Sequence, residues 1–118
     1  MRLKGLHILT LPTDDIFDQE SFLEILAALL EMPPAMTQDI DTFLFGMEKL
    51  DQTLDALEGL PPGMVVGLQV DDADTFVRRY PDLWSNLLWL CTQVNANRLE
   101  NGREPLFAVL PVGDPPQP

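Results

Sequence analysis

Three short apolar segments, separated by much longer segments of helical pattern, constrain the fold of this chain more than any other feature. They lie at residues 6–11, 64–70 and 106–110. The first two show little alternation between apolar and polar residues, which predicts strands buried on both faces of a sheet. Connections of this length need crossovers, and a crossover places neighbouring strands parallel. The sequence therefore predicts an α/β fold, with about four helices packed on a small three-stranded parallel sheet.

The segments between these strands have the apolar spacing that is typical of helices. The first helix is expected to begin at Ser21, which has the spacing of a capping box with Glu24. After two prolines a second helix is expected, with Thr37 as its cap. The pattern continues helically over residues 48–60, and the sequence leaves open whether these form a separate helix. A short helix, and then a long one that begins at Pro81, complete the set.

The chain has the size and composition of one globular domain. With 118 residues, of which 46% are hydrophobic and 22% charged, it can bury roughly 65% of its unfolded surface. We see no internal repeat and no second domain. Because no packing residue follows Val112, we expect a single domain at residues 1–112 and a frayed C-terminal tail at residues 113–118.

The charge balance is strongly acidic. Asp and Glu number 19 against 7 Lys and Arg, which gives a formal net charge of -12. A charge of this sign and size repels nucleic acids and anionic membrane surfaces, and it attracts basic proteins from a distance. We therefore expect a basic protein as partner, without direct binding of nucleic acid or of a membrane.

Cysteine usage and the N-terminal segment bear on the compartment. Cys91 is the only cysteine, so an internal disulfide is impossible, which suits a reducing environment. The apolar run near the N-terminus is brief and is broken by Thr10 and Pro12, unlike a signal peptide or a membrane span. These observations predict a cytoplasmic protein.

The sequence lacks the usual signals of catalysis. His7 is the only histidine and lies in an expected strand, where packing is the simpler role. No phosphate-binding loop, dinucleotide fingerprint or nucleophile elbow is present. Asp71, Asp72 and Asp74 follow the second strand, where capping of a helix is favoured over a magnesium site. We predict no catalytic residue, no metal and no cofactor, and hence a protein that is not an enzyme.

The segment at residues 37–46 carries the strongest candidate site. At about 100° per residue, Asp41, Phe45 and Glu48 lie within a narrow arc that points away from the apolar stripe of the same helix. One interpretation buries Phe45 under residues 48–60, with the acids merely solvated. The other is an interface in which an aromatic anchor sits among carboxylates that meet a basic partner. The partner-binding residues are then predicted to be Gln38, Asp39, Asp41, Thr42, Phe45 and Glu48.

The order of these elements resembles the barstar-like family of intracellular ribonuclease inhibitors. The similarity spans about residues 3–111 and includes the first strand, Leu30-Glu31-Met32-Pro33, and the later strands. Family members carry a motif close to Asn-Leu-Asp-Ala-Leu-Trp-Asp, for which this chain has Asp39-Ile40-Asp41-Thr42-Phe43-Leu44-Phe45. Asp41 stands at the first acid of that motif, whereas Phe45 replaces the second. In such inhibitors this helix plugs the active site of a barnase-type ribonuclease, with its carboxylates at phosphate-binding positions.

Two functions follow from these expectations. The resemblance implies a barstar-like inhibitor, an immunity protein that blocks a cationic nuclease by occluding its active site with an acidic helix. The alternative is an α/β protein-interaction module that binds a non-nuclease partner, with Phe45 as its apolar contact. Neither function involves a chemical step.

Overall fold

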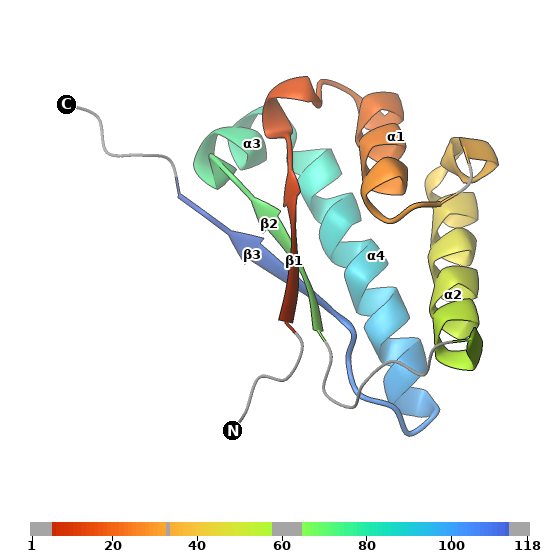
Figure 1. Ribbon diagram of the computed structural model, residues 1–118. Helices are drawn as coiled ribbons and strands as arrows, with labels where there is room; N and C mark the ends of the chain where they lie inside the picture. The colour runs from red at the N-terminus through yellow and green to blue at the C-terminus, as the bar shows by residue number, and fades with distance from the viewer. Residues whose placement is uncertain (1–5, 33, 58–64, 114–118) are drawn as a thin grey trace.

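The computed structural model describes residues 6–32, 34–57 and 65–113, and Figure 1 shows how their helices and strands are arranged. The strands are β1 (Leu6–Leu11), β2 (Val65–Val70) and β3 (Phe107–Pro111). The helices are α1 (Gln19–Leu29), α2 (Ile40–Leu57), α3 (Ala73–Arg79) and α4 (Pro81–Glu100). Two short 3-10 turns, η1 (Thr13–Asp15) and η2 (Pro34–Thr37), precede α1 and α2.

The three strands form a parallel sheet in the order β1-β2-β3. Leu9 of β1 lies opposite Leu68 of β2, which in turn lies opposite Val109 of β3. The predicted α/β class, with a three-stranded parallel sheet and four helices, is confirmed. The predicted frayed tail cannot be compared, because residues 114–118 lie outside the described residues.

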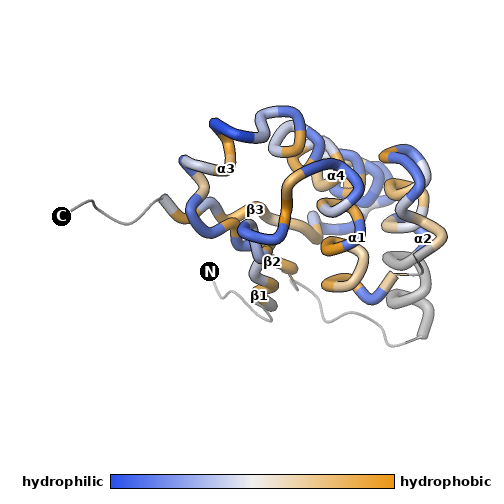
Figure 2. Tube along the Cα trace, turned by 90° about the horizontal axis from the view of Figure 1, so that it is seen from above, coloured by the Kyte–Doolittle hydropathy of each residue, from blue (hydrophilic) through white to orange (hydrophobic). Residues whose placement is uncertain are grey.

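The helices that contact the sheet lie on one side of it. α1 contacts β1 and α4 contacts β3, while α2 packs against α4 farther from the sheet, as Figures 1 and 2 show from two directions. Both crossovers step to the next strand in the same direction. Right-handed crossovers that run in one direction return along the same face of a sheet, so one layer of helices results.

The first strand is consequently buried on one face, and the prediction of burial on both faces is wrong for β1. Leu11 is 1% exposed and Leu9 packs against the core, whereas Ile8 is 47% exposed and Thr10 is also exposed. The side chain of His7, which we expected to be packed, lies outside the described residues. An apolar run shows that a strand is present, but the direction of the crossovers decides which face the helices cover.

The core lies between the sheet and the helices. α4 supplies its longest stripe, spaced at intervals of three and four residues as expected for a helix with one buried face. Five of the side chains on this stripe are Leu83, Leu87, Leu90, Cys91 and Val94, all buried.

Helix α1 begins at Gln19, and its N-cap lies three residues before the predicted cap Ser21. Asp18 is its N-cap, with a side-chain oxygen that accepts a hydrogen bond from the Ser21 N–H at 2.8 Å. The Ser21 hydroxyl oxygen in turn accepts from the Asp18 N–H at 3.1 Å. The capping box is therefore Asp18 with Ser21, and the predicted pairing of Ser21 with Glu24 is wrong. Ser21 is the third residue of the helix, and the hydrogen bond that its hydroxyl oxygen accepts from the N-cap backbone completes the capping box.

Helix α2 is continuous from Ile40 to Leu57, which answers the question left open by the sequence for residues 48–57. Residues 58–60 lie outside the described residues. None of the helices within the described ranges is both long and apolar enough to cross a membrane.

Candidate functional site

Asp39 starts the helix that carries the predicted site. Its side-chain Oδ1 accepts a hydrogen bond from the Thr42 N–H at 2.7 Å, and its carbonyl oxygen accepts from the Phe43 N–H at 3.0 Å. The bond from the Thr42 backbone holds the pKa of Asp39 below its usual value. Thr37, the predicted cap, instead ends the η2 turn. Asp39 is one of the six predicted partner-binding residues, and its side chain caps the N-terminus of its own helix.

The two faces of α2 differ in their exposure to solvent. Phe43 is 0% exposed and Met47 1% exposed, and both belong to the core. Phe45 is 52% exposed, although it lies only two positions from Phe43. The interpretation in which Phe45 is buried under residues 48–60 is wrong, because residues 48–57 continue along the same helix and do not fold back over it.

The structure brings most of the predicted residues onto one side of α2. Asp41 and Phe45 are exposed one helical turn apart, and the half-buried Glu48 follows at the next turn. Gln38 is exposed just before the helix, and Thr42 is half-buried beside Asp41. We refer to Asp41, Phe45, Glu48 and Lys49 as the α2 outer face.

Lys49 belongs to this face and was missed by the sequence analysis. Its Nζ lies 5.3 Å from the centroid of the Phe45 ring, a distance at which a cation and an aromatic face attract one another. The spacing of four residues was the available signal, because such side chains are neighbours on a helix. The acids of the face therefore surround an aromatic ring that already contacts a cation.

Gly46 lets the preceding segment pack closely against α2. A Cβ at this position would lie 2.6 Å from Met32 Cε and 3.0 Å from Met36 Cγ. Met36 belongs to η2, which contacts both α1 and α2. The glycine that interrupts an otherwise good helical sequence thus allows η2 to fill the space between the two helices.

A groove lies between α1 and the segment that precedes α2, next to the predicted site. One part has a volume of about 460 Å³ and is lined by Glu20 and Glu24 of α1 and by Gln38, among other residues. A second part, of about 290 Å³, shares Glu24 and Thr37 with the first and is otherwise lined by Ala27, Ala28 and Met32. The groove has an acidic end and an apolar end. Sequence reasoning missed it because residues of two separate segments form it.

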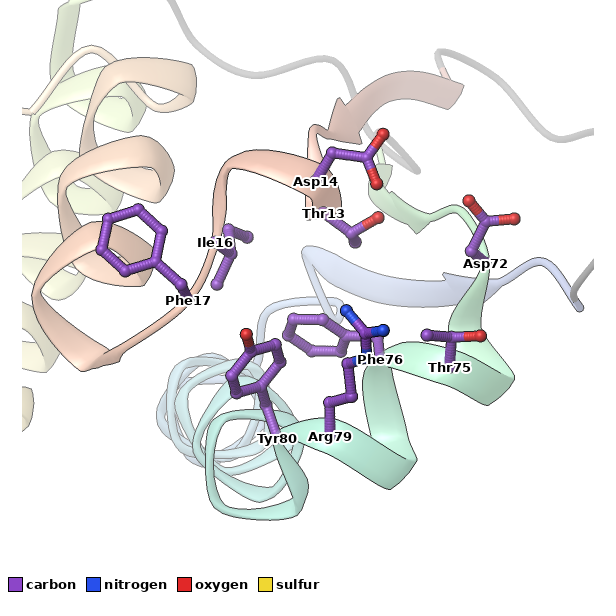
Figure 3. Close-up of a pocket in the computed structure, with 9 residues that line it drawn as sticks. All are labelled: Thr13, Asp14, Ile16, Phe17, Asp72, Thr75, Phe76, Arg79 and Tyr80. Atoms are coloured by element: carbon purple, nitrogen blue, oxygen red, sulfur yellow. The ribbon is translucent and has the colours of Figure 1, made fainter.

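A smaller pocket opens at the carboxyl ends of β1 and β2, with a volume of about 190 Å³. Figure 3 shows the side chains of Arg79 and Tyr80 extending from the end of α3 toward the segment that carries Thr13 and Ile16. Ligands of α/β sheets often bind at strand ends, at a point where the strand order reverses. The order β1-β2-β3 has no such reversal, and the pocket is smaller than a typical small-molecule site of roughly 300–1,000 Å³.

The aspartates near this pocket differ from the expectation of capping. The short helix α3 begins directly after Asp72, but the Asp72 side chain makes no capping hydrogen bond and its backbone is left-handed at φ 50°. Asp71 instead accepts a hydrogen bond from Gln69 Nε2 at 2.8 Å. In the described part of the chain, no group of three or more His, Cys, Asp or Glu side chains is placed to hold a metal ion.

No family model, curated protein or solved structure matches this chain. The resemblance to the barstar-like family therefore stays a prediction. The α2 outer face and the adjoining groove are the features of the molecule that point to a binding function.

Proposed function

We propose that the protein binds a basic partner protein through the α2 outer face and the acidic end of the adjoining groove. The observation that carries this proposal is Phe45, 52% exposed one turn from the exposed Asp41. An aromatic side chain that a partner can desolvate, with charges around it, is the usual form of an interface hot spot. The surrounding carboxylates favour a partner whose contact surface is positively charged.

Charge supports this choice of partner at two length scales. The net charge of -12 attracts a cationic protein before contact and raises its association rate. At contact, Glu20 and Glu24 line the groove beside Gln38, and Asp41 follows on α2. A Lys or Arg side chain of the partner could enter the groove while Phe45 packs against an apolar part of the same partner.

A cationic nuclease is the partner that the barstar-like resemblance favours. The protein would then be an inhibitor, such as an immunity protein, that acts by occluding the active site without performing chemistry itself. Asp41 occupies the position of the first acid in the family motif and would contact a phosphate-binding position of the nuclease.

A second candidate function is a protein-interaction module with a non-nuclease partner. Phe45 favours it, because an apolar ring stands where the family motif has its second acid. In this function Phe45 supplies most of the binding free energy, and Asp41 contributes little.

A binding experiment with matched controls tests the proposal. A barnase-type ribonuclease is titrated with the protein, and both inhibition and dissociation constant are measured for Asp41→Ala and Phe45→Ala. We expect each change to weaken binding by more than about 2 kcal/mol, or roughly 30-fold. Asp82→Ala removes an exposed acid from α4, and Phe17→Ala removes a phenylalanine that is 66% exposed. These two controls should bind like the unaltered protein.

The outcomes separate the two functions. Inhibition that depends on both Asp41 and Phe45 supports the nuclease inhibitor. If the ribonuclease does not bind, basic proteins captured from the source cells are tested with the same four variants. Dependence on Phe45 alone then supports the interaction module. Variants of Asp41 and Phe45 that bind every captured partner as well as their controls do would overturn both functions.

A further inference from the structure

Helix α4 presents an uncharged outer face in a strongly acidic protein. Its sequence carries no charged side chain from residue 83 to residue 97, between Asp82 and Arg98. Elsewhere the chain bears the carboxylates that give it a net charge of -12. A long solvent-facing helix normally carries charges on the side opposite the core, so solubility alone does not account for this composition.

Large apolar side chains occupy this outer face. Leu88 is 39% exposed, Trp89 38% and Leu99 58%. Helical geometry places them on the side of α4 opposite the buried stripe. The α4 outer face, as we call it, consists of exposed residues only: Ser85, Leu88, Trp89, Thr92, Ala96 and Leu99. A helix that is apolar on two opposite sides is expected to be covered on both of them.

We propose that a second copy of this chain packs on the α4 outer face, with the two α4 helices antiparallel around a twofold axis. In a twofold interface the same surface of each copy meets its equivalent on the other copy. A surface that carries charges of one sign would therefore repel itself. Two copies that met through their α2 outer faces would bring carboxylates together. Two copies that meet through α4 bring together only neutral side chains at the centre of the contact.

The position of the small residues fits an antiparallel pair. An axis that crosses between Trp89 and Thr92, close to the middle of α4, places Trp89 of one copy against Thr92 of the other. The same axis places Ser85 against Ala96 of the second copy, where two small side chains permit close approach of the helices. Asp82 and Glu100 then come to the rim of the contact, where water and salt screen their repulsion.

The area of the α4 outer face determines how tightly the two copies are expected to bind each other. A helix of 20 residues is about 30 Å long and about 10 Å wide, so α4 alone offers roughly 300 Å² per copy. A standard interface buries about 800 Å² per partner. We therefore expect a dimer that dissociates on dilution. Because the approaching copies have the same sign of charge, added salt should strengthen the dimer, whereas it should weaken association with a basic partner.

Sedimentation of the full chain over a range of concentrations tests the inference. The average mass should rise with concentration from 13.3 kDa toward twice this value, and it should rise further in high salt. Trp89→Glu should keep the protein monomeric at all these concentrations. Phe17→Glu adds the same charge at a residue that is 66% exposed, and it should dimerise like the unaltered chain.

Two results would overturn the proposal. One is a monomer at every concentration and salt level. The other is a dimer that Trp89→Glu weakens no more than Phe17→Glu does, which would place the contact elsewhere. If Trp89→Glu fails to fold by circular dichroism, Leu99→Glu replaces it, because Leu99 is 58% exposed and lies on the same face.

Discussion

Lys49 holds its Nζ 5.3 Å from the centroid of the Phe45 ring, one helical turn along the outer face of α2. Both side chains are exposed, and such a contact between an exposed cation and an aromatic ring contributes about 0.5–1 kcal/mol. Losing the contact between Lys49 and Phe45 therefore costs little free energy when another cation binds to the ring. In the free protein the ring is therefore already in a position where a cation of a basic partner could replace Lys49.

Replacing Lys49 by Gln should speed association with a basic partner. The change removes a positive charge from the centre of the proposed binding face, so the remaining carboxylates attract a cationic surface more strongly. With a barnase-type ribonuclease as probe, we expect a few-fold faster association at low salt and a smaller difference at high salt. Stopped-flow fluorescence measures both rates. Arg78→Gln makes the same change of charge on α3, and an equal acceleration by this control would refute a local role for Lys49.

Asp39 should make the stability of the protein depend on acid pH. Its carboxylate accepts the Thr42 N–H, which stabilises the charged form and lowers the pKa from the ordinary value of 3.8. A carboxyl whose pKa is lower in the folded state stabilises the fold above the pKa of the unfolded chain. That contribution is lost as the pH falls through the pKa of the folded state. Asp18 behaves alike, because the Ser21 N–H lowers its pKa.

Substitution by Asn isolates this effect, because Asn caps a helix about as well as Asp but does not titrate. Urea unfolding of Asp39→Asn at neutral pH and at about pH 3 should show a smaller loss of stability in acid than the unaltered chain does. The double variant with Asp18→Asn should show the smallest loss. Asp82→Asn, at an exposed acid of α4, is the matched control. An unchanged pH dependence in Asp39→Asn would contradict the role given to its hydrogen bond.

The sequence allowed the elements of the fold to be predicted because their apolar spacing reflects burial directly. The apolar stripe expected for the helix after the prolines includes Phe43 and Met47, and both are almost fully buried. The exposed face of β1 was not predictable from its own residues, because Ile8 is as apolar as a buried strand residue. Its exposure follows from the direction of both crossovers, which only the assembled sheet reveals.

Local hydrogen bonds and distant neighbours explain the other differences. Thr37 and Ser21 were expected as caps, but Asp39 and Asp18 hold those positions, each three residues before the N–H that it accepts. Several Ser, Thr and Asp residues near a helix start compete for the same role, so the pattern located the start only to within a few residues. The groove is lined by α1 and by the segment before α2, which lie apart in the sequence, and no local pattern contains this information.

Cys91 should react with thiol reagents only when the protein unfolds. It is 4% exposed on the buried stripe of α4, and burial raises its pKa to about 12. The thiolate is the reactive form, and at pH 8 almost none is present in the folded state. Labelling with a chromogenic disulfide reagent should be slow in buffer and should become fast across the urea transition. Rapid labelling of the folded protein would show that α4 opens locally or that the thiol is accessible.

Asn95 should be required for the start of β3, although its position on α4 did not suggest this role. Its Oδ1 accepts hydrogen bonds from the N–H groups of Leu106 and Phe107, both at 2.9 Å. Its Nδ2 donates to the carbonyl oxygen of Phe107 at 2.8 Å. One side chain thus satisfies three backbone groups where the chain enters the sheet beside Val66. Asn95→Ala leaves these partly buried groups unpaired and should destabilise the fold by about 2 kcal/mol or more.

Asn95→Asp distinguishes lost hydrogen bonds from lost packing, because the two side chains have nearly the same shape. The aspartate keeps the acceptor for Leu106 and Phe107 but sets a charged oxygen against the Phe107 carbonyl. The two accepted N–H groups favour the charged form, whereas partial burial and the facing carbonyl oxygen disfavour it. Only the protonated acid can donate to that carbonyl, so we expect the folded state to raise the pKa of this carboxyl. The variant should then lose stability as the pH rises through that pKa and should recover part of it in weak acid. Denaturation at pH 7 and at about pH 4 measures this recovery, and hydrogen exchange at Leu106 and Phe107 reports whether the start of β3 is the part that opens. A variant as stable as the unaltered chain at both pH values would mean that packing of Phe107 alone holds the strand in place.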